Sequence, residues 1–241
     1  PHILPGLYDN RGPQIRSAVS DLQLRLDDAG VPLQVVTGAD NHITPEFVGG
    51  LQSGHLLSLA DTRYVLVEPP HHVAPARLEE LFFGLLLAEY VPILTHPERL
   101  RWIENKYTVM QSLVARGVWM QVTSGSLTGR FGRRARYWAE RMLAEGCVHV
   151  LASDAHDLTR RPPDLAEGRQ AAEKLVGCEE AHHLVVTRPR GVLENKAPGE
   201  MPAPGGSAIP NDIGGRDGKV RTCGDDAGGG FARRMQRLLT G

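Results

Sequence analysis

Cysteines and long apolar runs are scarce in this sequence, and both absences narrow the class of protein. The three cysteines, Cys147, Cys178 and Cys223, are odd in number and lack metal-type spacing. They therefore favour a reduced, cytoplasmic setting over a disulfide framework. No apolar run is long enough to span a bilayer, and no signal-peptide pattern is present. We therefore expect no insertion into a membrane.

An excess of charge of one sign is also missing. The 27 Lys+Arg residues are balanced by 28 Asp+Glu residues, which leaves a formal net charge of −1. A nucleic-acid partner is not expected, because such surfaces are strongly basic. The sequence has no GxGxxG or P-loop pattern, no visible Ser-His-Asp arrangement and no Cys-x5-Arg loop. The sequence therefore predicts neither a glycine-rich nucleotide-binding loop nor a serine or cysteine nucleophile of these common types.

What the sequence does contain is a regular alternation of helical and extended patterns. With 241 residues it can hold one large domain or two small ones. Residues 1–12 are read as a loop, and Ile15, Val19, Leu22 and Leu26 form the apolar stripe of the first helix. The alternation predicts an α/β fold with a parallel sheet. Helices are expected at 13–29, 45–52, 77–89, 107–116, 133–145 and 164–176, and strands at 33–37, 64–67, 92–94, 118–122 and 148–151, with a last extended piece at 183–187.

The composition changes after residue 196. Residues 197–230 are crowded with glycine and proline and have almost no apolar periodicity, which predicts a disordered tail. Residues 231–239 could form a short basic helix, but a frayed terminus is the preferred interpretation. The sequence thus predicts one folded domain over 1–196, followed by a tail over 197–241.

Polar residues follow nearly every predicted strand. The clearest case is the stretch 148–156, Val-His-Val-Leu-Ala-Ser-Asp-Ala-His, in which a short apolar run gives way to Asp154 and His156. These two residues would point to the same face while the backbone stays extended, as a divalent metal requires. Alternatively, Ser153 and Asp154 form a turn or a helix cap and His156 lies in a loop. In parallel α/β enzymes, function gathers at the carboxyl ends of the strands.

Six residues at strand ends or in neighbouring loops are candidate metal ligands. Imidazole and carboxylate groups without thiolate suit manganese, iron or zinc in a site with two or three ions. Each also has a structural alternative, such as a turn cap, a solvated strand end or a histidine in a loop. His71 and His72 are weaker candidates for lining the pocket, and His42 for supporting it. The six candidate ligands are His2, Asp40, Glu68, His96, Asp154 and His156.

Two arginines add an anion-binding element. Arg99 lies three residues after His96, and Arg161 lies five residues after His156, so both can reach the same mouth. A guanidinium matches two phosphate oxygens with a planar fork. The alternative is that both arginines belong to the surface.

Several segments together resemble the PHP (polymerase and histidinol phosphatase) superfamily. Within it, the chain is most similar to the manganese-dependent protein-tyrosine phosphatases of bacterial capsule and exopolysaccharide operons. The resemblance covers residues 1 to about 195. The segments that carry it are Pro1-His2 with Gly6-Leu-Tyr-Asp-Asn10, Gly38-Ala-Asp40, Leu66-Val-Glu68-Pro, Thr95-His-Pro-Glu-Arg99, Ser124-Gly-Ser-Leu-Thr-Gly-Arg-Phe-Gly132, and Ser153-Asp-Ala-His156 with Arg161-Pro-Pro.

The resemblance implies a distorted (β/α)7 barrel with a metal centre at the carboxyl ends of its strands. The substrate it implies is phosphotyrosine on the autokinase that regulates polysaccharide export. The six candidate ligands would hold the metal ions, Arg99 and Arg161 would hold the phosphate, and a metal-activated water would attack phosphorus. The resemblance gives no oligomeric state.

Two departures from the family pattern bear on these expectations. The Asp-x-His-x-His motif of the first strand is absent, so we expect a barrel that lacks the first strand and most of the second, as in a chain truncated at its N-terminus. Asp40 stands where the family has glutamate, which keeps a carboxylate but shortens the side chain by one methylene. Two alternative functions follow: a small-molecule phosphatase of the histidinol-phosphatase type, or a catalytically impaired regulatory module.

Overall fold

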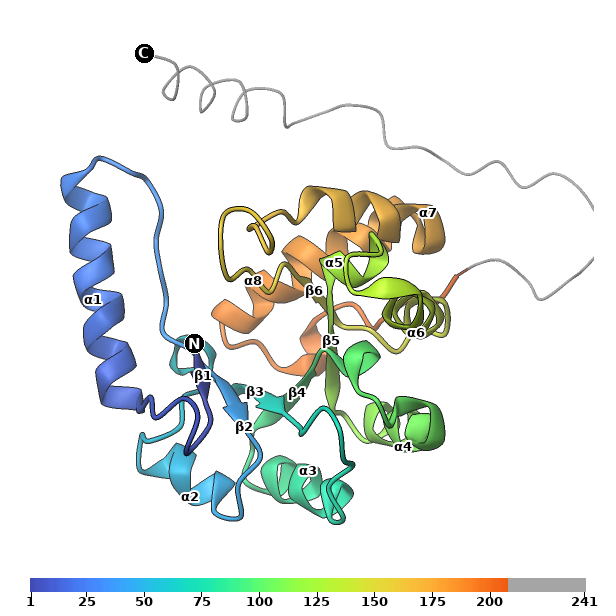
Figure 1. Cartoon of the computed structure of the whole chain (residues 1–241), viewed down its shortest axis with the longest axis horizontal. Helices are drawn as coiled ribbons and strands as arrows, with labels where there is room; N and C mark the ends of the chain where they lie inside the picture. The colour runs from blue at the N-terminus through green and yellow to red at the C-terminus, as the bar shows by residue number, and fades with distance from the viewer. Residues whose placement is uncertain (208–241) are drawn as a thin grey trace, which may run out of the picture. The chain divides into compact units, whose positions relative to one another are not determined.

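Six short parallel strands form the centre of the protein. The computed structural model describes residues 1–207, and the strand order is β1-β2-β3-β4-β5-β6. Among these residues β1 and β6 are the edges, so the sheet is an open half-barrel (Figure 1). The predicted α/β class with a parallel sheet is confirmed. The strands are β1 (His2–Ile3), β2 (Asp40–His42), β3 (Tyr64–Glu68), β4 (Val91–Thr95), β5 (Trp119–Thr123) and β6 (Val150–Ala152).

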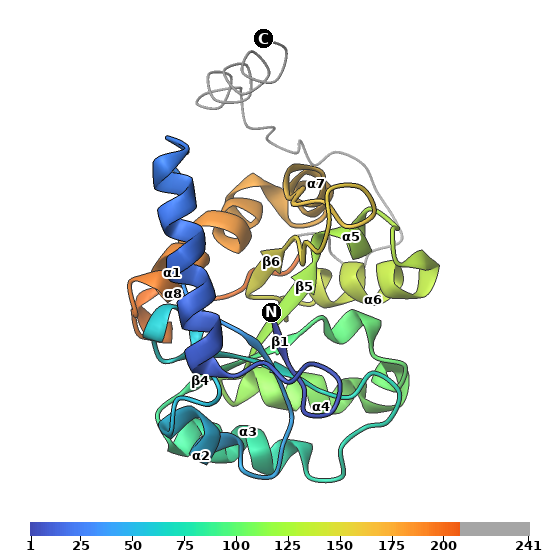
Figure 2. The same cartoon turned by 60° about the vertical axis from the view of Figure 1, so that its left-hand side comes forward.

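Helices connect consecutive strands, as parallel pairing requires. Helices α2 and α3 lie on the lower side of the sheet and α7 on the upper side in both views (Figures 1 and 2). The sequence predicted the helices between residues 12 and 182, apart from the short α5. The helices are α1 (Gly12–Asp28), α2 (Phe47–Gln52), α3 (Leu78–Leu87), α4 (Ile103–Ala115), α5 (Ser124–Leu127), α6 (Gly132–Ala144), α7 (Ala166–His182) and α8 (Arg188–Leu193).

The start of the sheet differs from the prediction. Residues 33–37 do not form a strand; β2 begins at Asp40, where Asp40 N donates to the carbonyl of Pro1. A strand needs a hydrogen-bonded neighbour, and pairing with β1 and β3 begins only at this residue. The reading of residues 1–12 as a loop was also wrong in part, because His2–Ile3 is strand β1.

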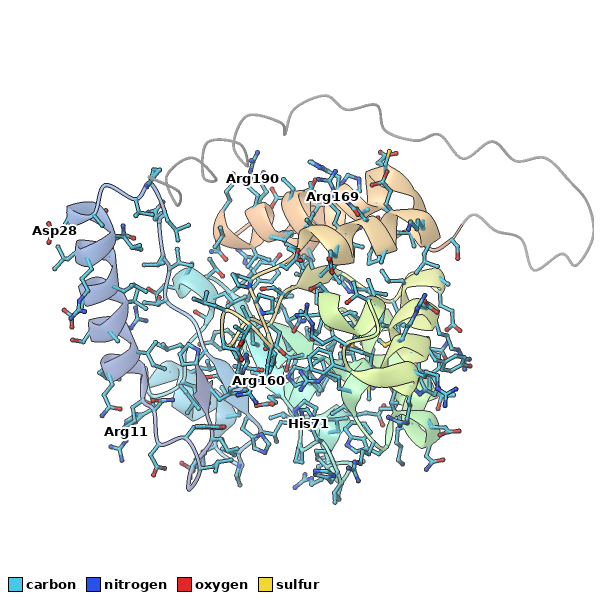
Figure 3. All side chains as sticks on the ribbon, turned by 45° about the horizontal axis from the view of Figure 1, so that its top comes forward. Arg11, Asp28, His71, Arg160, Arg169 and Arg190 are labelled. Atoms are coloured by element: carbon cyan, nitrogen blue, oxygen red, sulfur yellow. The ribbon has the colours of Figure 1, made fainter. Side chains whose placement is uncertain are left out.

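Two further predictions about the helices were wrong. Residues 183–187 are a wide helical turn between α7 and α8, with Leu184 buried, and not an extended piece. The apolar stripe of α1 is buried only at its beginning: Ile15 is buried, whereas Leu22 is 48% exposed. Arg11 and Asp28 mark the two ends of this helix in Figure 3. The predicted apolar face is therefore only partly covered by the described residues, with Val19 and Leu26 half-buried.

The sheet has an apolar core on each face, because strand side chains alternate. Val65, Val67 and Leu94 belong to the large core that the helices cover. Tyr64 and Trp119 belong to a smaller cluster on the other face, with Met201. Along β3 the smaller cluster's face carries Tyr64, then Leu66, and ends at Glu68. The candidate site therefore lies next to this second core, at the carboxyl ends of the strands.

The folded body extends past the predicted boundary at residue 196. Arg188 is fully buried and holds Glu180 through two hydrogen bonds of 2.8 Å each. Its remaining donors bind the carbonyls of Pro202, Ala203 and His149. Residues 197–207 are thus tied to the body, while 208–241, including the possible helix at 231–239, lie outside the described residues.

The helices of the structure were also compared with what a membrane span requires. In residues 1–207, no helix combines the length and apolar character that crossing a bilayer requires.

Candidate metal and phosphate site

The register of the sheet brings four of the predicted ligands to one edge. His2 is paired with Asp40, and His42 with Glu68, on adjacent parallel strands. His96 follows the last residue of β4, and its backbone N–H donates to the carbonyl of Gln121 in β5. The carboxyl ends of neighbouring parallel strands meet at the same edge, so these side chains converge although they are far apart in sequence.

The Glu68 carboxylate lies at the centre of the cluster. Its Oε2 is 2.8 Å from His2 Nδ1 and 3.9 Å from His42 Nδ1, and its Oε1 is 3.5 Å from Nε2 of both His71 and His96. Burial works to raise the pKa of Glu68, but the hydrogen bonds with His2 and His71 hold that pKa well below its usual range. The hydrogen bond to Glu68 raises the pKa of His2. The centre thus favours a charged carboxylate.

Asp40 and His96 complete this group. His96 Nε2 lies 3.4 Å from Asp40 Oδ2, and Thr95 Oγ1 donates to Asp40 Oδ1 at 3.1 Å. His96 is 2% exposed and has a φ of 37°, in the left-handed region that histidine seldom occupies. Such a conformation costs on the order of 1–3 kcal/mol and is often found at functional sites.

These side chains suit a divalent cation. Two groups of three donor residues, Glu68 with His71 and His96 and His2 with Asp40 and Glu68, have donor atoms within 4.8 Å of one another. Nδ1 of His42 and Nδ1 of His96 are buried without a hydrogen-bond partner in the described residues. Imidazole and carboxylate donors in such proximity fit manganese, iron or zinc. His71, predicted only as a weaker candidate for lining the pocket, lies within one of these groups. The signal in the sequence was its position shortly after a strand.

The guanidinium groups of the two predicted arginines bind the same carboxylate. Arg99 Nη1 donates to Asp154 Oδ2 at 2.8 Å, and Arg161 Nη2 binds the same oxygen. Both guanidinium groups contact the ring of Phe131, at 4.4 and 5.7 Å from its centroid. The expectation that both arginines reach one mouth is met in the geometry, and Phe131 is a shared platform that the sequence analysis did not identify.

Asp154 and His156 lie near the two arginines, but the backbone that carries them is not the extended segment that was predicted. Strand β6 ends at Ala152, and Asp154 has a φ of 50°, so the backbone there is not extended. His156 Nδ1 nevertheless lies 3.6 Å from Asp154 Oδ1, and the ring of His156 is 5.7 Å from that of His2. Neither residue belongs to the two groups of donors above. They lie at the rim beside them.

The loop that carries His96 and Arg99 is anchored by a buried glutamate. Glu98 Oε1 accepts hydrogen bonds from Ser126 Oγ at 2.7 Å and from the N–H of Thr123 at 3.1 Å. Burial raises the pKa of Glu98. Glu98 was not predicted to have a role, because nothing in the His-Pro-Glu-Arg pattern distinguishes a buried glutamate from an exposed one.

Fold and site together define an α/β half-barrel with a histidine and carboxylate centre and a pair of arginines at its strand ends. The chain belongs to the capsular polysaccharide synthesis family CpsB/CapC, whose family model matches residues 1–194.

Two relatives and a solved structure show how far this similarity extends. Over 179 residues the chain is 37% identical to the tyrosine-protein phosphatase YwqE of Bacillus subtilis (strain 168), which covers 74% of this chain and 70% of that protein. It is 28% identical over 203 residues to the tyrosine-protein phosphatase CpsB of Streptococcus pneumoniae, covering 80% of this chain and 81% of that one. The solved structure is from a study of YwqE and CpsB, described as unique metal-dependent tyrosine phosphatases. It matches with a TM-score of 0.79 at 33% identity, over 87% of this chain and 84% of the other.

Proposed function

We propose that this protein is a metal-dependent protein-tyrosine phosphatase that hydrolyses phosphotyrosine on a bacterial autokinase. The observation that carries the proposal is the position of Glu68, between two groups of histidine and carboxylate donors, beside two arginines that share one platform. The family and the phosphatases it resembles support the same reaction. We extend the proposal to a cytoplasmic role in capsule or exopolysaccharide synthesis.

In this proposal, manganese is the bound cation, in a site for two or three ions. His2, Asp40, Glu68 and His96 hold it, and Asp154 and His156 join from the rim. Divalent cations held there supply Lewis acidity, which lowers the pKa of water and neutralises phosphate charge. The shorter side chain of Asp40 still reaches the cluster, because its Oδ2 is 3.4 Å from His96 Nε2 and 3.9 Å from His2 Nδ1.

The protein's own groups bind and orient the phosphate. Arg99 and Arg161 present planar forks of N–H donors, which match two phosphate oxygens and stabilise the charge that develops on them. Phe131 keeps both guanidinium groups in place. The pairing of both arginines with Asp154 supports this role, because a carboxylate there uses the donors that phosphate oxygens would use.

The half-barrel and its strand-end site also support a PHP-type distorted (β/α)7 barrel as the parent architecture, and we include that assignment in the proposal. Its support is the parallel order of six strands with ligands at their carboxyl ends. The match to the solved phosphatase structure agrees with it.

The test is hydrolysis of a phosphotyrosine peptide by the full chain with manganese, with and without a chelator. Phosphoserine peptide and histidinol phosphate serve as competing substrates. We expect turnover of the phosphotyrosine peptide that the chelator abolishes. Preference for histidinol phosphate would support the small-molecule alternative. Absence of turnover with manganese bound would support the regulatory alternative.

A further inference from the structure

We propose that His71 is a metal ligand, and that it completes a second cation position with Glu68 and His96. The inference rests on the proposed function, since it assigns one more residue to the same centre. The resemblance that identified the other candidate ligands gave His71 no role. Its assignment comes from the position of its side chain.

The first step is the geometry around Glu68. Nε2 of His71 and Nε2 of His96 both lie 3.5 Å from Glu68 Oε1, and the two rings are 4.9 Å apart between centroids. The other oxygen, Oε2, faces His2. The two oxygens of Glu68 therefore face different sets of donors, as in a carboxylate that bridges two cations.

The second step is that His71 is held in place. Arg101 N donates to the carbonyl of His71 at 2.9 Å, and Trp102 Nε1 donates to the carbonyl of Pro70 at 2.8 Å. The loop between β3 and α3, in which Figure 3 labels His71, is thus tied to the segment that follows Arg99. Metal sites gain affinity when their ligands are oriented before binding.

The third step is the contrast with the neighbouring histidine. The side chain of His71 is 30% exposed and faces Glu68, whereas His72 is exposed and has no ion pair or ring contact among those described. One histidine of the pair therefore faces the centre, and the other provides a matched control of the same residue type.

The fourth step is the chemistry of the donor set. Two imidazoles and one carboxylate form a more nitrogen-rich set than His2, Asp40 and Glu68 do. Imidazole suits zinc and iron, carboxylates suit manganese, and cobalt binds a given set of donors more tightly than manganese does. Loss of His71 should therefore weaken the binding of cobalt or zinc more than that of manganese.

The experiment is titration of the metal-free full chain with Co²⁺, followed by calorimetry and by the visible absorption of bound cobalt. In His71→Ala we expect binding at one position to weaken by at least about tenfold, since even outer ligand partners change metal affinity by that much. We also expect the cobalt spectrum to change. In His72→Ala both readouts should match those of the unaltered chain.

The spectrum separates a ligand from a residue that only orients Glu68. His71→Gln keeps a hydrogen-bonding group but removes the imidazole. If His71→Gln and His71→Ala leave the cobalt spectrum and the affinity unchanged, the inference is overturned, while the phosphatase proposal stands as long as the unaltered chain binds cobalt and turns over substrate. An unaltered chain that binds no cobalt would overturn both.

Discussion

Arg99 and Asp154 join the loop after β4 to the loop after β6 through a hydrogen bond of 2.8 Å. The same Asp154 oxygen also accepts from Arg161. One carboxylate oxygen thus accepts hydrogen bonds from two guanidinium groups, both of which contact Phe131. In the proposed function, a doubly charged phosphate would compete with Asp154 for these donors.

The first prediction concerns the fork of Arg99. In Arg99→Lys, kcat/KM for a phosphotyrosine peptide should fall by roughly 10- to 100-fold, which is what loss of one or two charged hydrogen bonds costs. Most of the effect should be in KM, because the proposed role of Arg99 is to bind the phosphate. Steady-state kinetics measures the split. Arg101→Lys, at an exposed position nearby, is the control, and an equal loss there would contradict the assignment.

The second prediction concerns His96. His96→Ala should abolish turnover and lower the amount of bound metal, because it removes a buried imidazole that lies against the carboxylates of Asp40 and Glu68. Metal content is measured by elemental analysis after dialysis, and turnover by phosphate release. His55→Ala, at an exposed position, should behave like the unaltered chain. Near-normal turnover in His96→Ala would refute the site.

The third prediction concerns removal of the metal. A cation that binds only the folded protein stabilises it by about 2.7 kcal/mol at a concentration 100 times its dissociation constant. Thermal unfolding with manganese should therefore occur at a higher Tm than unfolding with a chelator. The difference in Tm should shrink in His96→Ala. An unchanged difference would show that manganese acts elsewhere.

The fourth prediction concerns pH and lies away from the site. Burial, with a contribution from Arg188, lowers the pKa of His149 to about 3 in the folded protein. In the unfolded chain histidine titrates near its ordinary value of about 6.5. The stability that neutral His149 contributes is complete above that value. It is lost as the pH falls from about 6.5 towards 3, because the unfolded chain takes up the proton first, by up to ~1.4 kcal/mol per pH unit.

The measurement for His149 is urea unfolding at several pH values between 4 and 8. His149→Gln keeps a group that can accept from Met120 N but does not titrate. Its free energy of unfolding should depend less steeply on pH below about 6.5. An equally steep dependence in both proteins would show that other groups are responsible.

The fifth prediction concerns Arg188. Arg188→Met removes every hydrogen bond that this side chain donates and leaves the Glu180 carboxylate buried without its partner. Breaking a buried pair in this way typically costs about 3–5 kcal/mol. Chemical unfolding measures the loss, and Arg190→Met, on the exposed side of the same helix, should cost less than about 0.5 kcal/mol.

The sequence predicted most of the fold because its local patterns and tertiary contacts agree. In α6, which the sequence predicted at 133–145, apolar residues at helical spacing such as Trp138 and Met142 are buried. The pattern misled where tertiary neighbours decide the outcome. Residues 33–37 have an extended pattern, but strand pairing begins only at Asp40, and Leu22 lies on an apolar stripe that few residues cover. Periodicity records what a segment can bury, and not what is available to cover it.

For the site, too, local sequence patterns predict one part and tertiary contacts decide the other. The kind of chemistry can be predicted from the order of residues, because imidazoles, carboxylates and arginines after successive strands suit metal and phosphate as ligands, and because parallel strands bring their carboxyl ends to one edge. Which of these groups meet depends on tertiary contacts. The strand register and the left-handed backbone of His96 place its ring against Glu68 and Asp40. The backbone of His71 accepts a hydrogen bond from Arg101 N, and its side chain faces Glu68. These contacts join segments that are distant in the sequence, so the local sequence does not indicate which of the two adjacent histidines faces the site.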